Sequence, residues 1–132
     1  MILNNILILF AFTNMIATAQ AAALIPHPSA EIAPEERLYI LNSYGVSVMD
    51  KATNTVVGDP IAVGGSPISA VLSSDGTRLY VMNTIGVLVI DTLTLRVAGD
   101  PILVGIAPIF AILSLDGTRL YVMGRDSNDI FV

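Results

Sequence analysis

The side chains in this sequence that could do chemistry are few, and most recur at a spacing of 41 residues. Aspartates lie at positions 50 and 91, 59 and 100, and 75 and 116, while arginines lie at 37, 78 and 119. Asp50 and Asp91 could place two carboxylates on one rim of the fold, and an arginine could bind a phosphate or a carboxylate. The sequence has one histidine and no cysteine. Disulfides, thiolate metal sites and cysteine nucleophiles are therefore excluded.

Structural roles account for these residues better than catalytic ones. A turn aspartate can accept a hydrogen bond from the backbone N–H two residues later, and this role suits the recurring aspartates. The arginines lie beside Asp-Gly pairs, where we expect solvated or locally paired side chains. His27 lies between Pro26 and Pro28, and a metal site needs further ligands. We expect Tyr39, Tyr80 and Tyr121 to pack between repeats, and Asn42 and Asn83 to stabilise turns.

Short catalytic motifs are missing from the sequence. It contains no HExxH, P-loop or G-x-S-x-G pattern, and Gly64-Gly65-Ser66 lacks the lysine and the spacing of a phosphate-binding loop. We therefore predict a non-catalytic chain with no cofactor and with no catalytic, cofactor-binding or metal-binding residues.

An internal repeat organises the chain from residue 36 onward. Residues 36–76 align with residues 77–117 without a gap, and 23 of the 41 positions are identical. A third copy begins at Thr118 and runs to Val132. Each copy contains four short runs of β-branched and apolar residues separated by turn signals. The pairs Asp75-Gly76 and Asp116-Gly117 predict type I′ turns, in which both central residues have positive φ.

Four short strands in about 41 residues are typical of a β-propeller blade. A blade is covered by a neighbour on each face, which explains why 54% of the residues are apolar and only 13% are charged. A parallel β-helix has shorter coils, and an outer-membrane barrel has longer, strictly alternating strands. We therefore predict an all-β protein built from blades of four antiparallel strands.

The repeat resembles the YVTN-type β-propeller repeat of surface-layer-like and lactonase-like seven-bladed propellers. The resemblance rests on Tyr80-Val81-Met82-Asn83, Val87-Leu88-Val89-Ile90-Asp91, Val104-Gly105-Ile106-Ala107-Pro108 and Ser114-Leu115-Asp116-Gly117, and it covers residues 37 to about 131. In the third copy, Gly124 replaces the asparagine of the first motif. The resemblance implies that the strand after each Val-Gly-x-x-Pro step lies innermost. Residues 37–63 are then a partial blade, 67–104 a full blade and 108–132 a partial blade.

About 2.5 blades form an incomplete ring, since closed propellers usually have four to eight blades. The chain could be a fragment of a larger propeller, could self-associate to complete a ring, or could bind a protein partner through its open blade edges. The sequence predicts a binding or interaction scaffold. The alternative is a fragment of a propeller enzyme, either a lactonase-like hydrolase or a periplasmic oxidoreductase subunit.

The N-terminus predicts export. Residues 1–25 carry no charged side chain, and the apolar segment is followed by Ala17-Thr18-Ala19, an A-x-A cleavage pattern. We expect a signal peptide over residues 1–19, or to 21 by the second pattern, and a linker over 20–36. Residues 2–25 could instead remain as a membrane anchor. The expected location is the periplasm, the cell surface or the medium.

The charge balance bears on the partners. The net charge is −5, with six basic and eleven acidic residues and no basic cluster. A nucleic-acid partner is therefore not expected. Contact with a membrane is expected only if the N-terminal segment is not cleaved.

Overall fold

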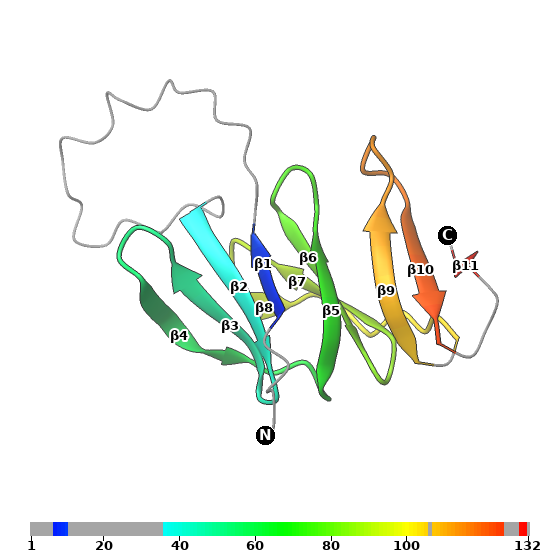
Figure 1. The fold of residues 1–132 in the computed structure, drawn as a ribbon, viewed down its shortest axis with the longest axis horizontal. Helices are drawn as coiled ribbons and strands as arrows, with labels where there is room; N and C mark the ends of the chain where they lie inside the picture. The colour runs from blue at the N-terminus through cyan, green and yellow to red at the C-terminus, as the bar shows by residue number, and fades with distance from the viewer. Residues whose placement is uncertain (1–6, 11–35, 106, 126–129, 132) are drawn as a thin grey trace.

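The described residues form eleven β-strands in three antiparallel sheets (Figure 1). The computed structural model describes residues 7–10, 36–105, 107–125 and 130–131. The strands are β1 (Leu7–Phe10), β2 (Arg37–Asn42), β3 (Gly45–Asp50), β4 (Thr55–Ile61), β5 (Pro67–Leu72), β6 (Arg78–Asn83), β7 (Val87–Asp91), β8 (Arg96–Val97), β9 (Pro108–Leu113), β10 (Leu120–Gly124) and β11 (Ile130–Phe131). The expected all-β class is confirmed.

Each sheet is one blade. Blade 1 has the strand order β1-β2-β3-β4, blade 2 has β5-β6-β7-β8, and blade 3 has β9-β10-β11. The blades lie side by side without closing a ring, and β5 contacts β9 on one side and β1 and β2 on the other (Figure 1). The strands after the Val-Gly-x-x-Pro steps, β5 and β9, each lie at one edge of their sheet and contact each other. The expected blade of four antiparallel strands is therefore confirmed.

The first blade takes its edge strand from a distant part of the chain. β1 pairs antiparallel with β2, with Leu9 opposite Tyr39, and it belongs to the segment predicted as a signal peptide. Cleavage after residue 19 would therefore remove this strand. The rest of the predicted signal peptide, the linker up to residue 35 and His27 lie outside the described residues, so these assignments stay predictions.

The hairpin between β2 and β3 depends on a glycine. Gly45 has φ of 134°, and a Cβ there would overlap the carbonyl group of Ile61 on β4. Its repeat equivalent, Gly86, approaches the carbonyl group of Ile102 in the same way. The glycines at these positions let the fourth strand lie close to the hairpin.

The turns at the Asp-Gly pairs differ from the prediction. The carbonyl oxygen of Ser73 accepts a hydrogen bond from the Gly76 N–H at 2.9 Å, and Gly76 has φ of 74°, whereas Asp75 is not among the residues with positive φ. Type I′ was therefore wrong, here and at Asp116-Gly117. The Asp75 carboxylate accepts bonds from the Ser73 hydroxyl and the Thr77 amide, and these bonds stabilise a turn in which only the glycine is left-handed.

The fourth strand also differs between blades. The fourth strand of blade 2 is interrupted, since β8 ends at Val97 and an isolated bridge between Val87 and Ile102 follows. Gly99, which lies between these two contacts, has φ of 75°. Blade 1 has the equivalent glycine, Gly58, within a continuous β4.

Two apolar clusters fill the interfaces between blades. Cluster 1 lies between blades 1 and 2 and contains Tyr39, Leu41, Val46, Val48, Val63, Ala70, Leu79, Val81, Leu88 and Ile90, with Val57, Ile61, Leu72, Leu95 and Val97 packed against it. Cluster 2 lies between blades 2 and 3 and contains Met82, Val87, Val104, Ala111 and Val122, with Val71, Tyr80 and Leu120 packed against it. Cluster 2 is therefore the smaller of the two.

Candidate functional site

Asp50 and Asp91 stabilise turns, as expected. The Asp50 carboxylate accepts the Ala52 N–H at 2.7 Å, and the Asp91 carboxylate accepts the Leu93 N–H at 2.9 Å. A backbone hydrogen bond, from Ala52 to Asp50 and from Thr94 to Asp91, is the main cause that lowers the pKa of each carboxyl. These carboxylates are committed to their own turns and do not converge on a shared site.

The aspartates of the Asp-Gly loops are bonded in the same local way. Hydrogen bonds from the Ser73 hydroxyl and from the Thr77 amide and hydroxyl lower the pKa of Asp75 to about 2. Equivalent bonds from Ser114 and Thr118 lower the pKa of Asp116 to about 2. A polar hollow of about 430 Å³ separates these two loops. The Asp75 and Asp116 carboxylates that line the hollow already accept hydrogen bonds from their own loops, so their role is to stabilise the turns.

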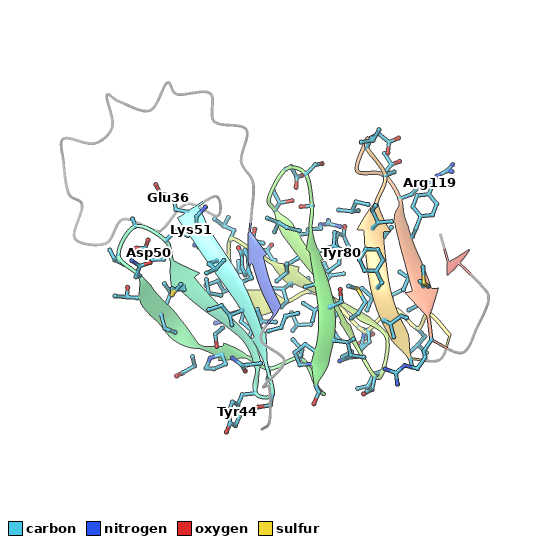
Figure 2. All side chains as sticks on the ribbon, viewed as in Figure 1. Glu36, Tyr44, Asp50, Lys51, Tyr80 and Arg119 are labelled. Carbon is cyan, nitrogen blue, oxygen red and sulfur yellow. The ribbon has the colours of Figure 1, made fainter. Side chains whose placement is uncertain are left out.

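The three repeated arginines have different environments. Arg78, the first residue of β6, and Arg119, which directly precedes β10, are both exposed, as expected. Figure 2 labels Arg119. Arg37 is only 3% exposed, and its guanidinium donates a hydrogen bond to the carbonyl oxygen of Thr92 in blade 2. The expectation of a solvated or locally paired side chain was therefore wrong for Arg37. The following blade covers it and provides its partner.

Arg37 also affects the tyrosine beside it. Tyr39 is fully buried in cluster 1. Burial raises the pKa of its hydroxyl, and the neighbouring Arg37 guanidinium opposes that rise. Among the described residues, neither the Tyr39 hydroxyl nor the Arg37 Nε has a hydrogen-bond partner. Tyr39 packs between blades as expected, and Tyr80 lies between blades 2 and 3 (Figure 2).

The two asparagines stabilise turns, and one also links segments. Asn42 accepts the Tyr44 N–H at 2.9 Å, and Asn83 accepts the Ile85 N–H at 2.8 Å. The amide of Asn83 also donates to the Val63 carbonyl oxygen at 2.5 Å, which holds the Val-Gly-x-x-Pro segment against blade 2. Gly124 of the third copy lacks a side chain that could do the same.

The described ranges contain no group of three or more His, Cys, Asp or Glu residues that could hold a metal ion. A helix long and apolar enough to cross a membrane is likewise not found among the residues that the structure describes.

The most distinctive surface belongs to blade 3. Phe110, Ile112 and Met123 are 52%, 57% and 47% exposed. They alternate along β9 and β10 with Ala111 and Val122, which face blade 2 in cluster 2. We call the surface formed by Phe110, Ile112 and Met123 the open face of blade 3. The sequence predicted the strands of this blade, but it did not identify these residues as exposed.

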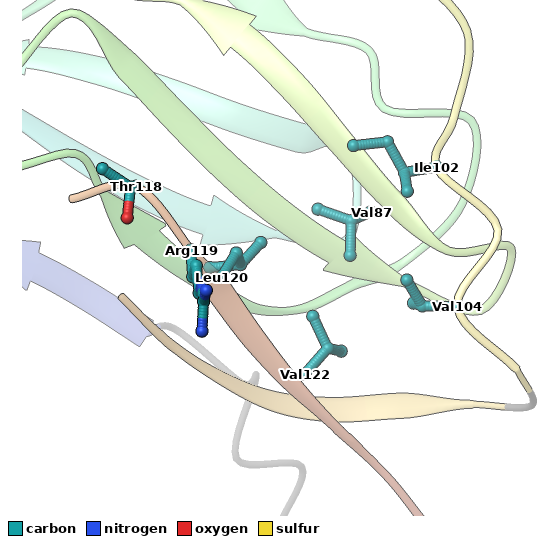
Figure 3. A pocket seen from close by; sticks show the side chains of 7 residues that line it. All are labelled: Val87, Ile102, Val104, Thr118, Arg119, Leu120 and Val122. Atoms are coloured by element: carbon teal, nitrogen blue, oxygen red, sulfur yellow. The ribbon is translucent and has the colours of Figure 1, made fainter. Parts of the chain in front are cut away.

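An apolar pocket adjoins this blade on its other side. The pocket has a volume of about 410 Å³ and lies between blades 2 and 3 (Figure 3). Blade 2 and the segment after β8 contribute Val87, Ile102 and Val104, and blade 3 contributes Thr118, Arg119, Leu120 and Val122. No sequence motif pointed to it.

The arrangement of the blades defines a β-propeller-like fold, and a comparison with solved structures supports it. The chain is similar to Kuenenia stuttgartiensis hydrazine synthase, a protein that contains a β-propeller, with 31% sequence identity and a TM-score of 0.63. The match covers 70% of this chain and 27% of that chain. No family model and no curated protein matches the sequence.

Proposed function

We propose that this protein is an exported, non-catalytic β-propeller scaffold of the YVTN repeat type that binds proteins through the open face of blade 3. The observation that carries the proposal is the exposure of Phe110, Ile112 and Met123 on adjacent strands. Contiguous apolar surface of this kind is typical of interaction sites.

The repeat shows what such a face does elsewhere in the molecule. The residues 41 positions earlier are Ser69, Val71 and Met82 in blade 2. Met82 is fully buried and Val71 is partly buried in cluster 2, where blade 3 covers them. Phe110 and Ile112 are more apolar than their equivalents Ser69 and Val71 in blade 2. The open face of blade 3 is nevertheless exposed to solvent.

The partner is a protein or a second copy of this chain, bound through open blade edges. The predicted signal peptide favours a periplasmic, cell-surface or secreted location, with membrane contact only if the segment is retained. The acidic net charge of −5 does not favour nucleic acid.

The open face is tested with an apolar fluorescent dye and by sedimentation velocity over a range of protein concentrations. The Ile112→Lys/Met123→Lys variant is compared with Tyr44→Lys/Val56→Lys, which adds the same charge at residues of blade 1 that are 83% and 62% exposed. We expect dye fluorescence and any self-association to fall in the first variant and to persist in the second. Equal behaviour of the two variants would contradict the role of the open face.

Export is tested by expressing the full chain in a bacterial host and determining the N-terminus of the exported protein. A new N-terminus at Gln20 or Ala22 supports the signal peptide. A chain that stays in the cytoplasm with Met1 intact contradicts it.

A fragment of a propeller enzyme is the second candidate, and the likeness to hydrazine synthase favours it. A lactonase-like hydrolase or a periplasmic oxidoreductase subunit fits this class. Reading the coding DNA downstream of Val132 tests the candidate. Further repeats that bring a cluster of His, Asp or Glu would support it, and a stop codon at that point would count against it.

A further inference from the structure

The apolar core of the predicted signal peptide forms a strand of blade 1. Residues 6–12 are an uninterrupted apolar run, and such a run is the part of a signal peptide that enters the membrane. Four residues of this run form β1, which pairs antiparallel with β2. The segment that is expected to direct export is therefore part of a sheet in the folded chain.

β1 holds the place in blade 1 that β5 holds in blade 2. β5 pairs with β6 along Leu79–Met82, and the residues 41 positions earlier are Leu38–Leu41 of β2. β1 pairs with this same stretch of β2 in the same antiparallel sense. It also contacts β5 of the neighbouring blade (Figure 1). The pairing is thus the regular pairing of the first strand of a blade, made here by part of the predicted signal peptide.

A strand in this position cannot act as an export signal at the same time. A signal peptide acts by entering the membrane as a separate apolar segment. Lipid offers no hydrogen-bond partners, so a segment can enter it only when its backbone groups are paired within the segment itself. The backbone of β1 is paired with β2 instead. β1 must therefore leave the sheet before the signal peptide can enter a membrane.

The order of folding leaves time for export. Only Ser43 and Tyr44 separate β2 from β3, whereas the chain from residue 11 to residue 36 separates β1 from β2. The entropy lost on closing a loop rises with the length of the loop, so we expect β2 and β3 to pair before β1 joins them. The signal segment is then free while blade 1 is forming and paired once the blade has formed.

The strand edge that receives β1 is held in place by the rest of the blade. Tyr39 and Leu41 of β2 are buried in cluster 1, between blades 1 and 2. β2 also pairs with β3 along its whole length, from Arg37 to Asn42. A fixed strand edge with unpaired backbone groups readily binds an extended segment. Folding of blade 1 therefore creates the acceptor for the signal segment of the same chain.

We propose that the pairing of β1 with β2 is an autoinhibitory contact that withdraws the export signal once blade 1 has folded. The proposal rests on the proposed export of this protein and names what controls it. A chain is exported only while β1 is free, and a chain that folds first keeps its signal peptide and stays in the cytoplasm. Cleavage after residue 19 makes export irreversible, because β1 is removed with the signal peptide.

The first test compares the rate of signal-peptide removal from the full chain and two matched variants by pulse-chase labelling in a bacterial host. A Cβ at Gly45 of blade 1 would overlap the Ile61 carbonyl group, and a Cβ at Gly86 of blade 2 would overlap the Ile102 carbonyl group in the same way. Both substitutions by alanine disturb a β-hairpin, but only Gly45→Ala disturbs the blade that binds β1. We expect Gly45→Ala to raise the rate of removal about threefold or more, because export follows the fraction of chains with a free signal, and Gly86→Ala to leave the rate unchanged.

Hydrogen exchange measures the contact itself on the purified full chain with Met1 intact. We expect the amides of residues 7–10 to exchange about tenfold or more slowly than those of an unstructured chain, since they belong to a sheet. The Gly45→Ala substitution should remove most of this protection, and Gly86→Ala should change it by less than about threefold. The measurement on the unmodified chain needs no variant to fold.

Three outcomes would overturn the inference: unprotected amides in residues 7–10 of the full chain, an unchanged rate of signal-peptide removal in Gly45→Ala, or equal rates in the two variants. If the unmodified chain is processed at residue 19 and Gly45→Ala is processed at the same rate, the inference fails and the proposed export stands. If none of the three chains is processed, both fail.

Discussion

Leu79 and Leu120 occupy the same repeat position in two different environments, which makes their truncation a direct test of the blade packing. Leu79 is fully buried in cluster 1. Leu→Ala at such a site costs about 2–5 kcal/mol, because it removes apolar contacts and leaves a cavity. Leu120 is partly exposed and already lines a pocket of about 410 Å³. Leu120→Ala enlarges a pocket that already exists, so we expect it to lower the free energy of unfolding by about 1 kcal/mol.

Urea denaturation of the full chain, followed by far-UV circular dichroism, measures both free energies of unfolding. The slope of the free energy against urea concentration should be the same in wild type and both variants, so that the midpoints report stability alone. We expect Leu79→Ala to lower the free energy of unfolding at least twice as much as Leu120→Ala. Equal losses of unfolding free energy would show that Leu120 is as well packed as Leu79 in solution. They would refute the inference that an open pocket lies beside Leu120.

Further predictions concern the inter-blade arginine, the loop aspartates and the first strand. Arg37→Ala should lower the free energy of unfolding by about 2 kcal/mol, because it removes a buried charged donor to the Thr92 carbonyl oxygen. The thermal midpoint should fall by about 10 °C. Arg78 is exposed, so Arg78→Ala should change the free energy of unfolding by less than about 0.5 kcal/mol. The pKa values of Asp75 and Asp116 are lowered from 3.8 to about 2, so their stabilising contribution is present above pH 3.8 and is lost as the pH falls toward 2. The thermal midpoint of the wild type should fall over that pH range, and that of the Asp75→Asn/Asp116→Asn variant should fall less. An identical pH profile in the two proteins would contradict the stabilising role of these carboxylates. A chain that starts at residue 20 lacks β1, so amide exchange should speed up in β2 and stay constant in β6, as measured by mass spectrometry. Unchanged exchange in β2 would show that β1 does not protect it.

Much of the fold followed from local patterns that the repeat made visible. The 41-residue period, the four short apolar runs and the Val-Gly-x-x-Pro steps predicted the blades and the order of strands within them, because strand pairing between sequence neighbours is governed by nearby turns. The roles of Asp50, Asp91 and the two asparagines were also predictable, since each bonds to backbone only two or three residues away. The turn type at Asp75-Gly76 was not, because the Ser73 and Thr77 hydroxyl groups both donate to the Asp75 carboxylate and stabilise a turn in which only the glycine has positive φ.

The candidate surfaces depend on contacts between blades, which the sequence pattern does not specify. Arg37, Arg78 and Arg119 share one repeat position, yet only Arg37 meets a carbonyl group of the following blade. The open face of blade 3 and the apolar lining of the neighbouring pocket likewise consist of residues whose equivalents are buried or partly buried one repeat earlier. No local pattern distinguishes a covered residue from an uncovered one.

The sequence by itself determined the unit of this protein, a blade of antiparallel strands, and the 41-residue spacing at which that unit repeats. Those properties follow from periodicity and turn chemistry, which act over short stretches of chain. Only the tertiary structure decided which repeated side chains are buried, that β1 pairs with β2 in the first blade, and that an apolar pocket lies between blades 2 and 3. Burial depends on what packs against a residue from the next blade, and in a repeat protein that neighbour is 41 or more residues away.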